Sequence, residues 1–146
     1  KWFEDLGDAP PLNILVIDPN GTVETLDFYQ KGRFEYYNSR KEEQVKIALR
    51  LVKEGLKEKD IEKIARGATE SALANQELLP KPDLPEVIKW AKDVKALGVN
   101  IAHSGTVMGL LLPPDGPHPE EIAPYLKRKK PEWNYYPTCL INGGLK

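Results

Sequence analysis

The chain has 146 residues, of which 40% are hydrophobic and 29% charged, and its formal net charge is −1. This size and composition are typical of one globular domain, residues 1–146. A nearly neutral chain has no overall field that attracts nucleic acid or an acidic membrane surface, so we expect neither as a partner. The single cysteine, Cys139, excludes a disulfide framework and a thiolate zinc site.

The sequence also bears on location and completeness. No apolar run approaches the roughly 20 residues of a membrane-spanning helix, and no signal peptide opens the chain, so we expect a cytoplasmic protein. The first residue is Lys1 rather than methionine. We therefore expect a processed product, a trimmed fragment or part of a longer protein.

The first part of the chain predicts two strands. Leu12–Ile17 is a short apolar run that is typical of a buried strand, and residues 18–21 follow it with strong turn chemistry. Asp18 is a candidate functional carboxylate, but beside Pro19 an Asx-turn is the better interpretation. Thr22–Phe28 alternates in part and predicts the second strand.

Three helices follow, and each has a recognisable start. Ser39 has the spacing of a capping box, whereas Asp60 and Asp83 can cap the second and third helices. We expect the third helix to end at Gly98. The predicted buried faces are Val45, Ala48, Leu49, Val52 and Leu56 in the first helix; Ile61, Ile64, Ala65, Ala68 and Ala72 in the second; and Leu84, Val87, Ile88, Ala91 and Val94 in the third. On the second helix, Thr69 or Ser71 is expected to bond back to the helix backbone.

A hairpin is expected directly after the third helix. Val99–Ala102 and Val107–Leu112 predict two strands, and the second of them is core. Past a proline-rich break, Pro119 suits the first turn of a short helix that runs to Leu126. A last strand is expected over Tyr135–Ile141.

These elements together predict an α+β fold. Strands separated by helices, with a central hairpin, indicate a ferredoxin-like sandwich in which an antiparallel sheet of about four strands has helices packed over one face. A parallel nucleotide-binding sheet fits less well, because the chain has neither a GxGxxG motif nor a GxxxxGK[ST] loop.

The turn of the predicted hairpin is the main candidate site. It combines an imidazole, two hydroxyls and a glycine that is free to take positive φ, so its backbone N–H groups can point together at a phosphate or carboxylate. On the residues alone, a hairpin turn that needs a small residue is the better interpretation. A lone histidine at a strand end is also more often structural than catalytic. The residues are His103, Ser104, Gly105 and Thr106.

The order of segments from Ser71 onward resembles the C-terminal domain of the GHMP small-molecule kinases. A polar helix end at 71–80, a connecting helix at 85–98 and the motif at 99–109 follow one another. Within that superfamily the sequence motifs most resemble those of the L-threonine kinases of cobalamin biosynthesis, which are associated with propanediol utilisation. The matching motifs are residues 15–18 together with 24–26, Leu79-Pro80-Lys81-Pro82, and residues 99–107.

The resemblance implies a ferredoxin-like domain that packs against a separate N-terminal ATP-binding domain or subunit. It implies that ATP and magnesium serve the intact enzyme, that a small hydroxylated metabolite, L-threonine, is the substrate, and that these residues bind substrate or phosphate: His103, Ser104, Gly105, Thr106, Asn75 and Gln76. For Asn75 and Gln76, a surface helix end is an equally good interpretation.

The family's phosphate loop, of Pro-x-x-x-Gly-Leu-x-Ser-Ser type, and its N-terminal catalytic carboxylate have no counterpart in residues 1–146. We therefore assign no catalytic residue, expect the chain alone to bind no cofactor and to be inactive, and expect an exposed apolar face that favours self-association.

Three other interpretations stay open. A free-standing module of the same fold could bind or sense a small ligand. A protein-interaction domain could use Trp133, Tyr135 and Tyr136, which are expected to be exposed aromatic residues. The basic run Lys127–Lys130 is best read as a solvated helix end, although it could contact phosphate or nucleic acid.

Overall fold

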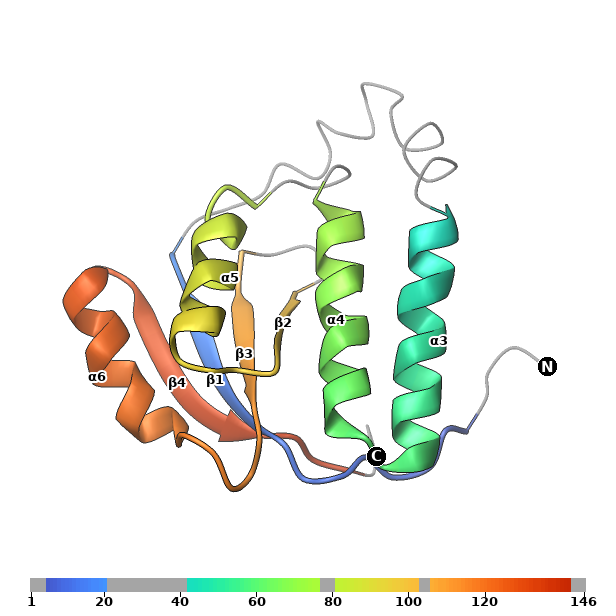
Figure 1. Cartoon of the computed structure of the whole chain (residues 1–146). Coiled ribbons are helices and arrows are strands. Elements are labelled where there is room, and N and C mark those ends of the chain that lie inside the picture. The colour runs from blue at the N-terminus through green and yellow to red at the C-terminus, as the bar shows by residue number, and fades with distance from the viewer. Residues whose placement is uncertain (1–4, 21–41, 77–80, 103–105, 143–146) are drawn as a thin grey trace.

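The computed structural model describes residues 5–20, 42–76, 81–102 and 106–142. Its strands form one antiparallel sheet in the order β2-β3-β1-β4 (Figure 1). β1 (Asn13–Asp18) lies between β3 (Met108–Leu112) and β4 (Asn134–Cys139), and β2 (Gly98–Ile101) pairs with the other side of β3. The strand predicted over Thr22–Phe28 and the helix start at Ser39 lie outside the described residues.

The connections between the strands produce the expected ferredoxin-like topology. The helices α3 (Glu42–Glu58), α4 (Ile61–Asn75) and α5 (Leu84–Asp93) lead from β1 to β2, and α6 (Pro119–Lys129) leads from β3 to β4. In each case a third strand lies between the two that are connected: β3 lies between β1 and β2, and β1 between β3 and β4. The prediction of an α+β sandwich with an antiparallel sheet of four strands is therefore confirmed for the described residues.

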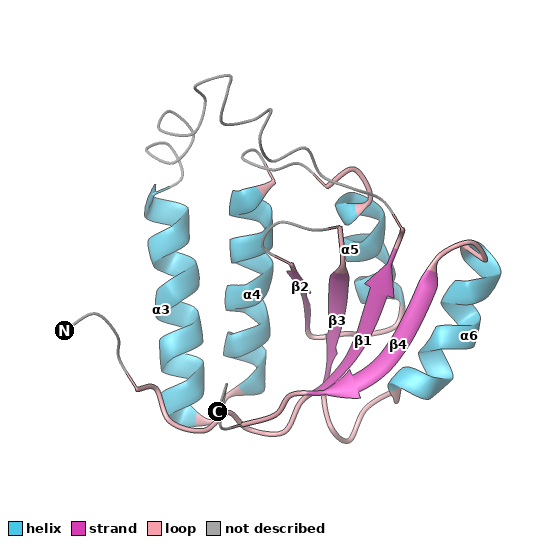
Figure 2. Cartoon of the chain, turned by 180° about the vertical axis from the view of Figure 1, so that it is seen from behind, coloured by secondary structure: helices cyan, strands magenta, loops and turns pink. Residues whose placement is uncertain are grey.

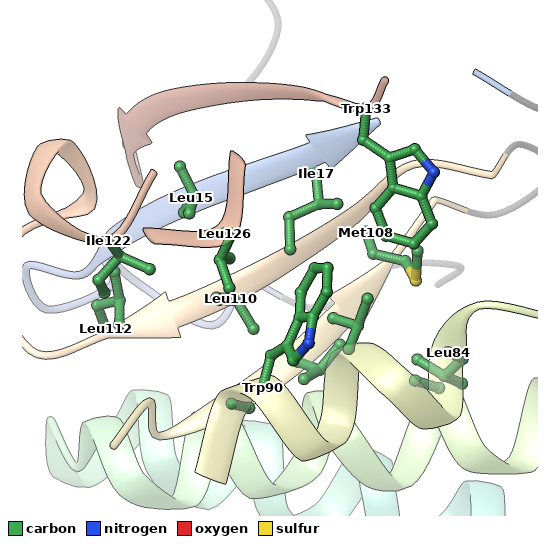
Figure 3. Close-up of a cluster of buried hydrophobic side chains, with 14 residues drawn as sticks. Leu15, Ile17, Leu84, Trp90, Met108, Leu110, Leu112, Ile122, Leu126 and Trp133 are labelled. Carbon is green, nitrogen blue, oxygen red and sulfur yellow. The ribbon is translucent and has the colours of Figure 1, made fainter. Parts of the chain in front are cut away.

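Two helices cover one face of the sheet. α5 and α6 pack on the same side, and alternate residues of β1 and β3 point toward them, as the period of two in a strand requires (Figure 3). The indole rings of Trp90 and Trp133 meet at the centre of this layer, with 5.5 Å between their centroids. The buried cluster is Leu15, Ile17, Ala72, Leu84, Val87, Trp90, Ala91, Val99, Met108, Leu110, Leu112, Ile122, Leu126 and Trp133.

The other two helices lie beside the sheet rather than over that face. α4 runs along the edge strand β2, and α3 packs against the outer side of α4 (Figures 1 and 2). The Thr69 hydroxyl donates to Ala65 O at 2.9 Å, as predicted, and it also accepts from Val99 N at 3.0 Å. One side chain therefore ties the helix to the strand. Residues of the second face of the sheet also contact α4, because Leu111 and Ile14 pack with Ala65 of this helix, whereas neither α5 nor α6 lies on that face (Figure 2).

Gly98 corrects one sequence expectation. The third helix ends at Asp93, and Gly98 is the first residue of β2. A Cβ atom at Gly98 would lie 2.5 Å from the Ala65 carbonyl oxygen. The glycine is thus explained by the close approach of α4 to the edge strand and not by a helix cap.

The two aspartate caps differ. The Asp60 side chain accepts from the backbone N–H groups of Glu62 and Lys63, at 3.1 and 3.2 Å, so this predicted cap is confirmed. Asp83 stands at the N-cap of α5, but its side chain makes no capping hydrogen bond. The position was predicted correctly and the bond was not.

Several smaller expectations also have an outcome. Asp18 forms the predicted Asx-turn, since its Oδ1 accepts from Asn20 N at 2.8 Å. The basic run closes α6 as a helix end, and α6 itself extends past Leu126 to Lys129. The last strand covers Asn134–Cys139, slightly earlier than predicted. None of the described helices is both long and apolar enough to cross a membrane.

Trp133 is not an exposed aromatic residue, which contradicts the expectation for an interaction surface. Its side chain is 5% exposed and packs in the core. Tyr135 is half-buried, and its hydroxyl donates to the carbonyl oxygens of Leu126 and Lys130. Burial, followed by the charges of Glu132 and Glu86, raises the pKa of Tyr135 to about 12. Of the three aromatic residues, Tyr136 alone is exposed.

Candidate functional site

The candidate residues come from elements that meet at one end of the fold. The C-terminal end of α4, the N-terminal end of α5, the last residue of β2 and the first residue of β3 all lie toward the same end of the molecule (Figures 1 and 2). Asn75 closes α4 and Gln76 follows it, whereas Thr106 precedes β3. His103, Ser104 and Gly105 lie outside the described residues, so their role in binding an anion stays a prediction.

The hairpin that carries the predicted turn is confirmed. Ile101 pairs with Met108, and Ala102 N donates to Val107 O at 2.9 Å. Thr106, the described member of the predicted turn, is half-buried. The pairing of the two strands was therefore predicted correctly, whereas the turn lies mostly outside the described residues and its ligand stays a prediction.

The side-chain amide of Gln76 is bonded to the backbone of Lys81 from both of its ends. Nε2 donates to Lys81 O at 2.8 Å, and Oε1 accepts from Lys81 N at 3.0 Å. The amide thus mimics a paired backbone strand and fixes the position of Lys81. Each of its polar atoms has one hydrogen-bonding site left, so direct contact with a ligand stays a prediction. Asn75 is half-buried, and its amide makes no hydrogen bond to the described residues.

Lys81 is the buried charged residue of the described core, with 1% of its surface exposed. Its Nζ atom is inaccessible to water and has no hydrogen-bond partner among the described residues. Burial lowers the pKa of Lys81 below its ordinary value of 10.5, because the low-dielectric interior penalises the charged form. An ammonium in such a place costs several kcal/mol unless an anion compensates it, on the order of what is found for buried ions.

Sequence reasoning missed Lys81 as a site residue. In the sequence, Leu79-Pro80-Lys81-Pro82 indicates only a motif that resembles the kinase family. A lysine between two prolines shows no periodicity that would predict burial, and lysine is a residue type that is rarely buried without a partner. One signal was present: Gln76 lies five residues before Lys81, at the end of a helix, where a side chain can close a loop.

Two hollows lie next to each other and share Asn100 and Ile101 in their linings. One, of about 230 Å³, lies over the sheet and includes Gly109, where a Cβ atom would collide with the Asn100 side chain. The other, of about 380 Å³, is an apolar groove between α3, α4 and β2. Val45 and Leu49 of α3 line this groove and are 47% and 55% exposed. These two side chains form part of an unpartnered apolar surface.

The described residues offer no metal site. They contain no group of three histidine, cysteine, aspartate or glutamate side chains placed to hold an ion. The free Cys139 is exposed on the edge strand β4. Magnesium chemistry is therefore not assigned to this part of the chain.

Comparison with known proteins agrees with the fold. The family model described as "GHMP kinases C terminal" matches residues 52–132, more than half of the chain. In the crystal structure of L. major mevalonate kinase in complex with R-mevalonate, the matching region has a TM-score of 0.63 at 16% identity, over 92% of this chain and 44% of that one. At this identity the match shows a shared fold.

Two curated relatives are similar in sequence, and both are named L-threonine kinase. The protein from Salmonella typhimurium is 32% identical over 103 residues, which are 70% of this chain and 34% of that protein. The protein from Citrobacter freundii is 33% identical over 103 residues, or 70% and 35% of the two chains. The chain therefore spans about a third of the length of these relatives. Because the family model covers more than half of the chain, the chain belongs to the GHMP kinase family, as a C-terminal domain.

Proposed function

We propose that the chain is the C-terminal domain of an ATP-dependent kinase that phosphorylates the hydroxyl group of L-threonine, in cobalamin biosynthesis. The observation that carries the proposal is the sequence similarity to two proteins named L-threonine kinase over 70% of the chain. The matched structure of mevalonate kinase supports the same class of fold but leaves the substrate open, because its identity is low.

Phosphoryl transfer demands positioning and electrostatic stabilisation more than covalent chemistry from the protein. In the proposed role, residues 103–106 and the end of α4 supply donors that hold a carboxylate or phosphate group of the small molecule. Asn75 supplies an amide that can both donate to and accept from an amino acid. No described residue is assigned as the catalytic base.

ATP and magnesium belong to the complete enzyme in this proposal. The described residues contain no metal-holding group, and the printed sequence contains no Pro-x-x-x-Gly-Leu-x-Ser-Ser loop. We therefore assign nucleotide and metal binding to an N-terminal domain or subunit. The apolar groove beside Val45 and Leu49 is the surface that we assign to contact with that partner, because an exposed stripe of this kind favours burial against protein.

The test is phosphorylation by the complete protein that contains this chain. L-Threonine and ATP with magnesium should yield O-phospho-L-threonine and ADP in equal amounts, detected by mass spectrometry and a coupled ADP assay. L-Serine and R-mevalonate serve as matched alternative substrates. Formation of a different phosphorylated product would reassign the substrate, whereas no turnover with any small alcohol would contradict the kinase proposal.

The isolated chain is the control for the missing half. We expect it to produce no O-phospho-L-threonine by itself, since it lacks the phosphate loop. A reading frame that places a Pro-x-x-x-Gly-Leu-x-Ser-Ser segment before Lys1 would support the kinase. A start codon near Lys1 with no partner chain would favour a free-standing ligand-binding module instead.

A further inference from the structure

The inference concerns Lys81, whose surroundings differ from those of every other buried side chain that the structure describes. The described core is otherwise made of apolar residues, and Lys81 is its one buried charged group. It is also the one buried side-chain nitrogen or oxygen among the described residues with no hydrogen-bond partner. Buried polar groups are nearly always paired, so an orphaned ammonium calls for a physical explanation.

A purely structural role explains Lys81 poorly. Replacing a buried charge by an apolar side chain of similar volume is often neutral or stabilising, so packing alone does not favour lysine here. The position is nevertheless held firmly, because Gln76 bonds both the N–H and the carbonyl group of Lys81. Leu84 N also donates to Lys81 O at 3.1 Å. The backbone is thus fixed by three hydrogen bonds, while the ammonium group makes none to the part of the chain that the structure describes.

The start of α5 adds a second, independent observation. Lys81 lies two residues before Asp83, the N-cap of this helix, whose side chain makes no capping bond. A helix N-terminus carries a partial positive charge, which an anion stabilises. An uncapped helix start and an unpaired ammonium next to it in the chain both favour one kind of ligand, which bears negative charge on oxygen.

We propose that Lys81 is an anion-binding residue whose ammonium group pairs with a carboxylate or phosphate group of the small-molecule substrate or product. Gln76 acts through it as a positioning residue. The proposal rests on the proposed function for the identity of the small molecule, but the chemistry of the site needs only an anionic group with free oxygens. A bound anion would supply the missing partner and would keep Lys81 protonated.

The first test is NMR on the unaltered chain with ¹³C- and ¹⁵N-labelled lysine. The probes are inorganic phosphate, O-phospho-L-threonine, L-threonine and L-threoninol, which lacks the carboxylate. We expect the side-chain signals of Lys81 to move with at least one anionic probe and not with L-threoninol. A response to L-threonine identifies a carboxylate site, and a response to phosphate or O-phospho-L-threonine alone identifies a phosphate site. Lys81 signals that no anionic probe moves would overturn the proposal.

The second test removes the charge. Lys81→Met retains the length of the side chain, and Lys89→Met alters an exposed lysine of α5 as the matched control. Lys81→Met should weaken binding of the responding anion by roughly tenfold or more, the usual size of a hydrogen bond to a charged group. Lys89→Met should leave that affinity unchanged. Equal affinities for both variants and the unaltered chain would contradict the proposal, and the NMR result stands even if Lys81→Met does not fold.

These tests separate the inference from the proposed function. Anion binding at Lys81 with no phosphorylation of L-threonine by the complete protein would leave the site intact and remove the kinase assignment. Phosphorylation of L-threonine with kinetics unchanged by Lys81→Met would keep the kinase and remove the site. In the complete enzyme we expect the variant to raise KM for L-threonine, or to lower kcat if the phosphate group is the ligand.

Discussion

The starts of α4 and α5 have similar sequences and different structures. Each begins after an aspartate, yet Asp60 accepts two backbone N–H groups, whereas Asp83 makes no capping bond. Before α5, Gln76 instead fixes the backbone of Lys81, whose buried ammonium has no partner within residues 5–20, 42–76, 81–102 and 106–142. The N-terminal end of α4 is thus stabilised by a capping side chain. The N-terminal end of α5 leaves the Asp83 carboxylate and the Lys81 ammonium available for other contacts. This arrangement is expected where a protein reserves stabilising contacts for a ligand.

The well-packed interior beside α5 provides the largest contrast with Lys81. Trp133→Ala removes an indole that packs against Trp90 in the core, so we expect it to lower the free energy of unfolding by about 3–5 kcal/mol. Tyr136→Ala, at an exposed site on β4, is the control and should change it by less than about 0.5 kcal/mol. Chemical denaturation measures both. Similar small losses would mean that Trp133 is not part of the core.

Breaking the Gln76 bonds tests whether they hold the segment before α5. Gln76→Leu leaves the N–H and carbonyl groups of Lys81 without these partners, and should cost about 2 kcal/mol of unfolding free energy. Gln44→Leu removes a longer amide–carboxylate contact to Glu70, 3.3 Å, and should cost less than about 0.5 kcal/mol. If the two variants lost equal stability, the Gln76 bonds would have no special role.

The pH dependence of stability should reveal the buried ammonium. The folded-state pKa of Lys81 is lowered and the unfolded value is the ordinary 10.5, so between these two values the unfolded chain binds more protons. Stability therefore rises with pH up to 10.5, by at most about 1.4 kcal/mol per pH unit. Below the folded-state pKa the penalty is constant. The measurement is the unfolding free energy of the unaltered chain minus that of Lys81→Met, from pH 7 to 10.5; a flat difference would contradict a lowered pKa.

The prediction with the smallest expected effect compares alanine variants of Asp60 and Asp83. Asp60→Ala removes a cap with two accepted bonds and should cost about 1 kcal/mol. Asp83→Ala removes no capping bond and should change stability by a few tenths of that, about 0.3 kcal/mol. Equal losses would show that Asp83 caps α5 in solution.

Sequence reasoning predicted the elements that follow from periodicity and failed where contacts between distant residues decide. The hairpin from Val99 to Leu112 follows from local pattern, and the topology follows from the order of the elements. The predicted buried face of the first helix was wrong at Val45 and Leu49, which are exposed. The role of Gly98 was predicted wrongly because a glycine is needed there to make room for the carbonyl group of Ala65, which is more than thirty residues away in sequence. The exposure of Trp133 was predicted wrongly because a tryptophan next to a basic run is typical of the protein surface. Its indole ring instead packs against Trp90 of α5.

The candidate site was predicted only in part, for a related reason. Turn chemistry indicated residues 103–106, and the family resemblance indicated Asn75 and Gln76. Neither source indicates that the Gln76 amide bonds Lys81 or that the ammonium of Lys81 is buried. Both facts depend on the contact between Gln76 at the end of α4 and Lys81 before α5, which no local pattern encodes.

The stability of Lys81→Met, measured with and without an anion, tests the central claim most directly. Without ligand, we expect the variant to be as stable as the unaltered chain or more stable by about 1–4 kcal/mol, because a buried unpaired charge is removed. Saturating O-phospho-L-threonine should then stabilise the unaltered chain and not the variant. A variant that loses stability without ligand, yet gains as much from the anion as the unaltered chain, would show that Lys81 is structural and that the anion binds elsewhere.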